Sequence, residues 1–411
     1  LEDTQYDYNF QWRPTLNLGV SNNSNVKGVG LELTKRSEFG TIFSVSSRYE
    51  EFESDLTGTT SKSPSISVGI EQGLFRNWGS DIGRLPLTKS EISKEKEYWS
   101  IVARKQSMIR SSIQKYFDVI VSEKQFSLKK LSVERSSKNL EVTESRYGLG
   151  LVSKIDVYRT KLAVLNSKDA EKSELRSLKR SKRVVSDLIN QDHIDNYNLA
   201  DNINNFNFII PNNYLHVALQ ARSDWQKFLL DEKLNKLELM QAKKQLMPDI
   251  KLTLSAKKYF DQFETFDGAL NDDINWNIGL SYNSPFDLSR EKNSLVRQLL
   301  KNRAHQRKRR ELQRKISQEI DDAIDNLNLA QDRVIIANER QLQSEKAVEL
   351  AKIRFQRGLS NNLDLVEAEN AFQAANIDVL QQRIQVNLSK VLLAEKLGIL
   401  DIKWLENAVN I

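Results

Sequence analysis

The sequence contains no cysteine, and it has only six prolines and fifteen glycines in 411 residues. Without cysteine there is no disulfide, no thiolate metal ligand and no cysteine nucleophile. The three histidines, His193, His216 and His305, are widely separated and do not have the spacing of metal ligands. No nucleophile, metal cluster or phosphate-binding loop stands out, so we expect a protein that is not an enzyme and has no cofactor.

The sequence also lacks any run of about 18 apolar residues, which predicts that it has no transmembrane helix. Only 39% of its residues are hydrophobic and 28% are charged. Such a composition is more typical of long exposed helices than of a thick globular core. The sequence opens at Leu1 without a basic and then apolar leader, which indicates a mature or trimmed product.

Basic residues slightly outnumber acidic ones, which gives a net charge of +6. The basic excess is concentrated in residues 297–315. Such a segment is either a solvated helix face or a binding site for a polyanion. No aromatic residues interleave there for stacking on bases. We therefore favour the solvated face and expect no nucleic-acid partner.

Apolar residues alternate with small polar ones in several short runs between residues 10 and 72, and again after Pro248, which predicts β-strands. The clearest apolar positions are Leu16, Leu18, Val20, Val29, Leu31, Leu33, Ile66, Val68, Ile70, Ile250, Leu252, Leu254, Ile278 and Leu280. One face of each strand is therefore apolar and the other small and polar. This pattern suits strands with lipid outside and a watery lumen inside. An ordinary soluble sheet would show the same alternation.

Long helices are predicted where glycine and proline are absent. Neither residue occurs between Leu87 and Tyr147, and apolar residues recur there at helical spacing. About sixty helical residues make a rod of roughly 90 Å. Residues 287–356 contain two columns with a spacing of seven: Ile320, Leu327, Val334, Gln341, Val348 and Phe355, and Ala323, Ala330, Ala337, Ser344 and Ala351. Alternating large and small columns predict a coiled-coil seam with close helix approach.

The end of each long helix is followed by a near copy of one motif. RYGLGLVSKIDVYRTK begins at Arg146, and RFQRGLSNNLDLVEAE begins at Arg354. The ungapped alignment pairs Gly150 with Gly358, and two copies at this separation indicate a duplicated chain. Each glycine can end a helix in a left-handed conformation, and Ser153 or Asn361 can cap the next one. Each copy is thus predicted to be the tip of a helical hairpin.

These tips resemble those of the TolC-type outer-membrane efflux proteins, which act in tripartite efflux or type I secretion systems. That family has a Gly-Leu or Gly-Thr turn followed by a hydrophobic-Asp-hydrophobic helix start, once in each half. The resemblance implies an α+β membrane protein with a duplicated strand pair and long helical hairpin. It also implies a homotrimer, with a shared outer-membrane β-barrel continued by a periplasmic α-helical coiled-coil barrel. A single sheet left open in lipid would expose unpaired backbone groups, which independently favours several copies.

The strand and helix patterns, together with what the resemblance implies, predict six segments. We expect first barrel strands in 1–86 with a possible extra hairpin at 26–50, a first helical hairpin in 87–190 with its tip at 147–155, an equatorial linker and helix in 191–246, second barrel strands in 247–286, a second hairpin in 287–398 with its tip at 355–363, and a C-terminal segment in 399–411. The chain departs from the family in the extra hairpin and in a short or missing opening helix. The strand count per protomer, four or six, is therefore left open.

The resemblance implies a periplasmic gate at the tips. Asp364 and Glu367 are three residues apart on one helix face, and threefold symmetry would arrange them as stacked carboxylate rings. The alternative is that both carboxylates only stabilise the helix, because negative side chains interact favourably with the positive end of the helix dipole at its N-terminus. Family gates use an Asp in the first tip and a Tyr and an Arg in the second. Asp156 matches the Asp, whereas Phe355 and Ser360 replace the other two, for which we consider Lys154, Arg354 and Arg357 as substitutes.

The turns match the family's docking surface for a periplasmic adaptor (membrane fusion) protein. The predicted docking residues are Leu149, Gly150, Leu151, Val152, Arg357, Gly358, Leu359 and Ser360. We therefore expect an exit duct in the Gram-negative outer membrane that passively conducts substrates from an adaptor and an inner-membrane pump. The alternatives are a periplasmic adaptor and a soluble coiled-coil scaffold. Neither alternative needs lipid-facing strands together with a duplicated hairpin.

Overall fold

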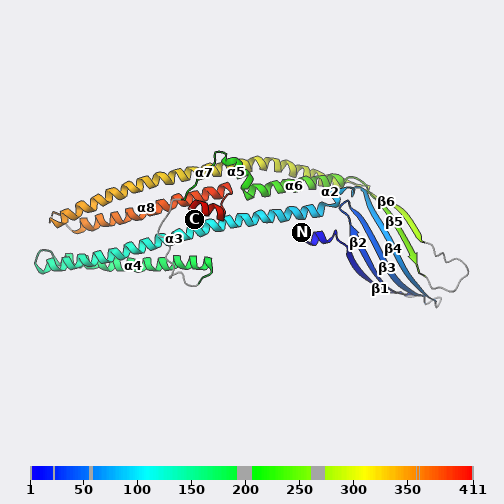
Figure 1. Cartoon of the computed structure of the whole chain (residues 1–411), viewed down its shortest axis with the longest axis horizontal. Helices are drawn as coiled ribbons and strands as arrows, with labels where there is room; N and C mark the ends of the chain where they lie inside the picture. Colours follow the sequence, from blue (N-terminus) through cyan, green and yellow to red (C-terminus); the bar gives the residue numbers. More distant parts are fainter. Residues whose placement is uncertain are drawn as a thin grey trace. The chain divides into compact units, whose positions relative to one another are not determined.

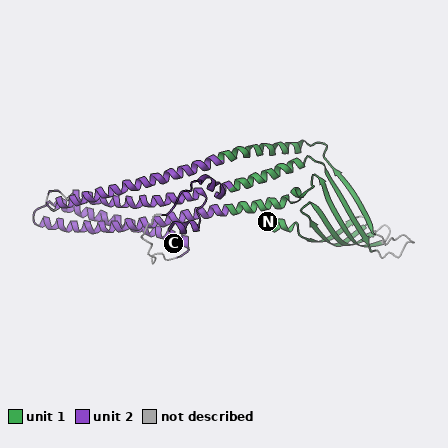
Figure 2. Ribbon diagram, turned by 45° about the horizontal axis from the view of Figure 1, so that its top comes forward, with its two compact units in different colours: residues 1–99, 226–311 green, residues 100–225, 312–411 purple. Residues whose placement is uncertain are grey.

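The computed structural model describes residues 2–21, 24–54, 59–191, 206–260, 274–357, 359–360 and 362–409. The chain divides into two compact units. Unit 1 comprises 1–99 and 226–311, and unit 2 comprises 100–225 and 312–411 (Figure 2). His193 and Gly358 lie outside the described residues. The fold class predicted from the sequence is confirmed, because an antiparallel sheet is combined with long helices (Figure 1).

Unit 1 contains a six-stranded antiparallel sheet whose strands follow one another in chain order. A short helix, α1 (Glu2–Tyr6), precedes the sheet. The strands are β1 (Gln11–Ser21), β2 (Ser24–Arg36), β3 (Thr41–Ser54), β4 (Thr59–Phe75), β5 (Asp249–Tyr259) and β6 (Asn275–Asn283). Residues 26–50 thus fall in two strands that are both paired within the sheet. The two edge strands are β1 and β6.

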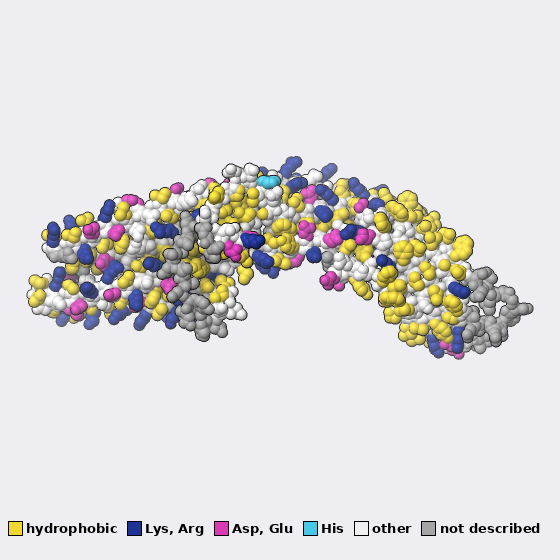
Figure 3. Space-filling view, in the orientation of Figure 1, with side chains coloured by type: hydrophobic (Ala, Val, Ile, Leu, Met, Phe, Trp, Pro, Cys, Tyr) yellow, Lys and Arg dark blue, Asp and Glu magenta, His cyan; other side chains and the backbone are white. Residues whose placement is uncertain are grey.

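The strand register gives the sheet two different faces, because directly opposed residues on paired strands share a face. One row across all six strands is apolar: Trp12, Leu33, Val45, Val68, Ala256 and Trp276. The adjacent row on the other face is polar or small: Gln11, Thr34, Ser44, Gly69, Ser255 and Asn277. The edge residues Trp12 and Trp276 are 62% and 74% exposed. Apolar side chains cover much of the sheet surface visible in Figure 3. The apolar face therefore needs an apolar environment outside the chain.

Helices continue from the strands of unit 1. They are α2 (Ser80–Gly83), α3 (Leu85–Gly148), α6 (Ser223–Lys244) and α7 (Ser289–Gln356), of which α3, α6 and α7 extend into unit 2. Ion pairs join α6 to α7, with Lys301 Nζ 2.7 Å from Glu238 Oε2 and Arg309 Nη1 3.5 Å from Glu232 Oε2. The basic segment 297–315 is thus partly neutralised by α6. Within the described part of the chain, no helix is both long enough and apolar enough to cross a bilayer.

Unit 2 is built from two helical hairpins. The return helices are α4 (Lys154–Ile189) and α8 (Asn362–Leu397), and the shorter helices are α5 (Tyr214–Ala221) and α9 (Ile402–Val409). In the first hairpin, the hydroxyls of Ser122 and Ser181 lie 3.1 Å apart. In the second, the seam on α7 is buried at Ile316, Ile320, Ala323, Leu327, Ala330 and Ala337. Further along α7, the Gln341 side-chain amide donates to Asn376 Oδ1 of α8 at 2.6 Å, so a position of the predicted large column contacts the return helix.

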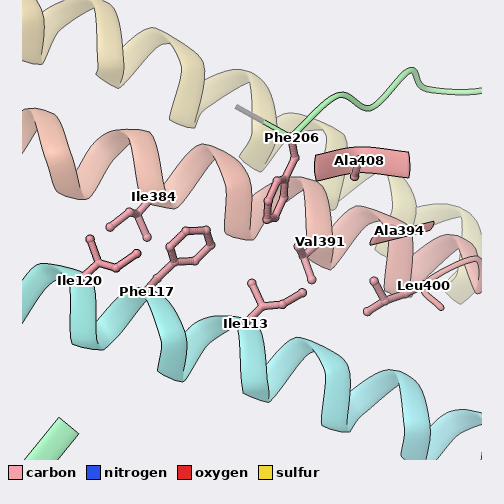
Figure 4. Close-up of a cluster of buried hydrophobic side chains, with 9 residues drawn as sticks. All are labelled: Ile113, Phe117, Ile120, Phe206, Ile384, Val391, Ala394, Leu400 and Ala408. Carbon is pink, nitrogen blue, oxygen red and sulfur yellow. The ribbon is translucent and has the colours of Figure 1, made fainter. Parts of the chain in front are cut away.

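A hydrophobic core joins the two hairpins (Figure 4). Its buried members come from α3, α8, the link between α8 and α9, α9 and the segment before α5: Ile113, Phe117, Ile120, Phe206, Ile384, Val391, Ala394, Leu400 and Ala408. Two buried polar side chains of α8 hold Phe206 in place. The Phe206 backbone N–H donates to Asn387 Oδ1 at 3.0 Å, and Lys390 Nζ donates to the Phe206 carbonyl oxygen at 2.7 Å. Burial lowers the pKa of Lys390.

A buried ionic network fixes the junction of α5, α6, α7 and α8. Arg222 donates to Asp224 Oδ2 at 2.7 Å, to Glu319 Oε2 at 2.9 Å and to the Lys396 carbonyl oxygen at 3.2 Å. Lys396 Nζ also lies 3.1 Å from Glu319 Oε2. Burial alone would raise the pKa of Glu319, but hydrogen bonds from Arg222 and Lys396 lower it below its ordinary value of 4.5.

The end of α8 is packed tightly against the same junction. Gly398 has φ +77°, and the Ile399 N–H donates to the Ala394 carbonyl oxygen at 3.0 Å. An added Cβ at Gly398 would lie 2.7 Å from the Ala221 carbonyl carbon. Glycine is required at this helix end for two reasons, since the backbone conformation and the available space both exclude a side chain.

Candidate functional site at the hairpin tips

The first tip, between α3 and α4, is a compact turn. Gly150 has φ +72°, and the Leu151 N–H donates to the Arg146 carbonyl oxygen at 2.9 Å. Ser153 caps α4: its Oγ accepts from the Asp156 N–H at 3.3 Å, while Asp156 Oδ2 accepts from the Ser153 N–H at 3.1 Å. This reciprocal pair is a capping box. Hydrogen bonds from Ser153 lower the pKa of Asp156.

The second tip repeats the backbone bond of the first. The Leu359 N–H donates to the Arg354 carbonyl oxygen at 2.9 Å, and these residues align with Leu151 and Arg146. The same bond at matching positions supports a duplicated turn. The residue expected to give a positive φ here, Gly358, lies outside the described residues, as does Asn361, the expected cap.

Apolar side chains project from the ends of both tips. Leu149 is 75% exposed, Leu151 70%, Leu359 72% and Leu363 68%. Arg357 is also exposed. Four leucines held open to solvent are unfavourable for an isolated chain and mark a contact surface. We call Leu149, Leu151, Leu359 and Leu363 the tip leucines.

The two tips meet at a shared cavity of about 360 Å³. The first hairpin contributes Asn139, Val142, Thr143, Arg146, Val152, Asp156, Arg159, Thr160 and Ala163, and the second contributes Phe355, Ser360, Leu363 and Val366. Four predicted site residues therefore line this cavity: Val152, Asp156, Phe355 and Ser360. Ser360 Oγ is buried there and has no hydrogen-bond partner among the residues that the structure describes.

Direct contacts between the hairpins near the tips come from α3. The Arg146 guanidinium lies over the Phe355 ring, with 4.8 Å between its central carbon and the ring centroid. Arg135 Nη1 lies 3.7 Å from Glu369 Oε2. Sequence reasoning missed both contacts. Arg146 precedes Tyr147, which aligns with Phe355, but this position alone does not indicate a contact with the other hairpin.

The predicted gate carboxylates are placed differently from one another. Asp364 and Glu367 are exposed in the first turns of α8. Asp156 is used by the α4 cap, and Arg159 Nη1 lies 3.9 Å from it. Lys154 is one of the basic residues considered as substitutes. Its Nζ lies 5.9 Å from the ring centroid of Tyr158, so this contact is made within the first turns of α4. Among the described residues, Arg146, which was not among those considered, reaches Phe355 of the opposite hairpin with its guanidinium.

The structure thus combines two copies of a long helical hairpin with an antiparallel sheet that has one apolar and one polar face. This combination defines the structural class of the protein. The sequence model of the family described as outer membrane efflux protein matches residues 214–398, which include the second strand pair and the second hairpin. The resemblance to TolC-type outer-membrane efflux proteins is thereby confirmed. The predicted location, the Gram-negative outer membrane with a periplasmic extension, is confirmed at the level of this family.

Solved structures of outer-membrane channels share the fold over nearly the whole chain. The channel OprN is 14% identical with a TM-score of 0.69, and the match covers 97% of this chain and 83% of that one. VceC of Vibrio cholerae is 15% identical with a TM-score of 0.68, covering 97% and 89%. MtrE of Neisseria gonorrhoeae, solved in an open state, is 17% identical with a TM-score of 0.67, covering 97% and 83%. A comparison with curated proteins finds no match.

Proposed function

We propose that the protein is the outer-membrane exit duct of a tripartite efflux or type I secretion system. Three copies would form one channel, which conducts substrates passively and is gated at the hairpin tips. An adaptor protein would dock on the tips and connect the duct to an inner-membrane pump. The observation that carries the proposal is the sheet with one apolar and one polar face and two free edges, joined to a duplicated hairpin.

The sheet supports a membrane position. Its apolar row runs from edge to edge and ends in the exposed Trp12 and Trp276. In lipid, the unpaired edge groups of β1 and β6 would be costly, so the sheet has to be closed by further copies. A soluble scaffold or a periplasmic adaptor does not need an apolar sheet face. We therefore favour the exit duct over both alternatives.

The tips support a gate. The cavity and the contact between Arg146 and Phe355 lie between the two hairpins, so any separation of the hairpins would break this contact. Asp364 and Glu367 are exposed beside it, and three copies would bring six carboxylates together in one narrow neck, as two stacked rings of three. Repulsion within such a ring favours bound cations over anions. The tip leucines provide an apolar surface for the adaptor.

The first experiment is to extract the protein from membranes and measure the particle mass in detergent. We expect an integral outer-membrane trimer. A water-soluble monomer obtained without detergent would disprove the proposal.

A second experiment tests the gate by single-channel recording in planar bilayers. Asp364→Asn with Glu367→Gln removes charge at nearly constant size. Cation preference and block by multivalent cations should both fall, while the trimer persists. The matched control is Glu345→Gln with Glu349→Gln, an exposed pair on α7. Equal selectivity and block in wild type and the Asp364, Glu367 variant would show that these side chains only favour the start of α8.

A further inference from the structure

A second cavity, of about 420 Å³, lies in unit 1 where three strand–helix connections come together. Arg76 and Asn77 follow β4, Lys244 and Gln245 precede β5, and residues 290–297 form the first turns of α7 after β6. All three connections leave the sheet at the same end, because antiparallel strands β4 and β6 finish where β5 begins. The cavity therefore borders one end of the two-faced sheet.

Backbone carbonyl groups hold the inner cationic side chains in place. Arg76 Nε donates to the Met247 carbonyl oxygen at 3.0 Å, and Arg76 Nη2 donates to the Gln245 carbonyl oxygen at 2.7 Å. Lys244 Nζ donates to the Trp78 carbonyl oxygen at 3.0 Å. These bonds tie the β4 connection to the β5 connection. The cavity wall is thus built by the fold and does not depend on a ligand.

Helix α7 contributes the charged side chains that are available to bind a ligand in this cavity. Arg290 and Arg297 are seven residues apart, so both lie on the same face of the helix, and both are exposed. Glu291 lines the same cavity, and its Oε2 is buried without a hydrogen-bond donor among the described residues. A buried carboxylate oxygen is costly when it has no donor. The cavity therefore offers two guanidinium groups for an anion and one carboxylate oxygen for a donor.

Exposed aromatic side chains stand beside these charges. Phe75 ends β4 and is 55% exposed, Trp78 is 54% exposed, and Phe286, which precedes α7, is fully exposed. Aromatic residues gather at the level of lipid headgroups in membrane proteins. If the sheet spans the membrane as proposed above, this end of it lies at a headgroup layer, with the cavity opening beside the aromatic residues.

We propose that this cavity binds the headgroup of a phospholipid that carries a primary ammonium group. The phosphate lies beside Arg290 and Arg297, and the ammonium donates hydrogen bonds to Glu291. Guanidinium groups match phosphate oxygens in geometry and charge. A phosphate alone leaves Glu291 without a donor and beside a like charge, whereas a phosphoethanolamine headgroup satisfies both. The inference rests on the proposed membrane position of the sheet.

Native mass spectrometry of the detergent-purified protein tests the assignment with three lipids of identical acyl chains. Phosphatidylethanolamine should bind about tenfold more tightly than phosphatidylcholine, whose quaternary ammonium cannot donate, and more tightly than phosphatidylglycerol. Arg290→Gln with Arg297→Gln should weaken phosphatidylethanolamine binding about tenfold or more. Glu291→Gln should abolish the preference for phosphatidylethanolamine over phosphatidylcholine. The control, Arg303→Gln with Arg307→Gln on the same helix, should leave binding unchanged.

Several outcomes overturn the inference. Equal binding of the three lipids, or unchanged binding in the Arg290, Arg297 variant, would show that the cavity does not recognise this headgroup. Glycerophosphoethanolamine without acyl chains binding as tightly as the lipid would identify a soluble phosphate ester as the occupant. A loss of trimer mass in that variant with lipid binding per chain unchanged would mean that a neighbouring copy fills the cavity. A protein that is monomeric in buffer without detergent would instead overturn the proposed function, so the two failures are distinguishable.

Discussion

Replacing Arg146 by Gln tests whether the contact between the hairpins keeps the proposed channel closed. The guanidinium of Arg146 lies 4.8 Å from the centroid of the Phe355 ring, and it joins α3 of the first hairpin to α7 of the second. Gln keeps a polar side chain of moderate length but has no positive charge for the ring. The backbone bond from Leu151 to the Arg146 carbonyl oxygen is unaffected by the substitution. We therefore expect the turn to remain folded while the contact is lost.

The size of the effect follows from the number of copies that open together. A cation–π contact at an exposed site contributes about 0.5–1 kcal/mol. In a trimer that opens as one unit, three such contacts contribute about 1.5–3 kcal/mol, which corresponds to roughly a 10- to 150-fold change in the closed-to-open equilibrium. Arg146→Gln should raise the ratio of open to closed channels by a factor in this range.

Recording from purified channels in planar bilayers measures the open probability directly. The series consists of Arg146→Gln, Phe355→Leu and the double variant, and a double-mutant cycle isolates the pairwise contribution. The two single variants should have similar effects, and the double variant should add little to either. Arg354→Gln is the matched control, because Arg354 is the exposed residue at the equivalent position of the second copy. If Arg146→Gln opened the channel no more than Arg354→Gln, or if the effects of the pair were simply additive, the contact would not be a lock.

Three further predictions concern the frame that supports the site. Gly150→Val forces a branched side chain into positive φ at the first tip, so adaptor binding measured with purified proteins should fall far more than the melting temperature of the trimer. Gly398→Ala should destabilise the protein by about 2–4 kcal/mol in thermal unfolding, from backbone strain and the close contact beyond its Cβ, whereas Gly148→Ala, which has open space around the added Cβ, should have little effect. Because the pKa of Glu319 is lower in the folded chain than its ordinary 4.5, its stabilisation is complete above about that pH and is lost as the pH falls below it through the folded value. The melting temperature of Glu319→Gln should therefore depend less steeply on pH than that of wild type below pH 4.5, and equal slopes would show that the network contributes nothing.

The features that could be predicted from the sequence are those set by local periodicity. Apolar and polar residues alternate with a period of two along each strand, which predicted the two faces of the sheet. A shift of the strand register by one residue would exchange the faces, so this pattern also restricts the register. A period of seven gave the buried seam at Ile320, Leu327 and Ala330. The turn residues were predictable for the same reason: Gly150 has the positive φ that its place between two helices requires.

What could not be predicted depends on how distant segments approach each other. Nothing in the residues around Phe355 indicates that Arg146, more than two hundred positions earlier, lies over its ring. The role of Asp156 was also hidden, since a carboxylate three residues after Ser153 suits a cap and a gate equally well, and the cap is formed. A second apolar stripe on α7, including Ile335, Ile336 and Leu350, is exposed in this chain and has no counterpart in the predicted seam.

The even number of strands in the sheet decides how copies can be joined. Because β1 to β6 alternate in direction, β1 and β6 run antiparallel, and the β6 edge of one copy can pair with the β1 edge of the next in the same antiparallel pattern. A ring of any number of copies can therefore close with every strand pair antiparallel, including the pairs between neighbouring copies. With three copies of six strands, the ring falls in the size class of the porins, whose interiors are too wide for side chains to fill. The serine, glycine and asparagine residues of the polar face would then line open water, and the width available to a passing molecule would be limited at the helical end of the duct.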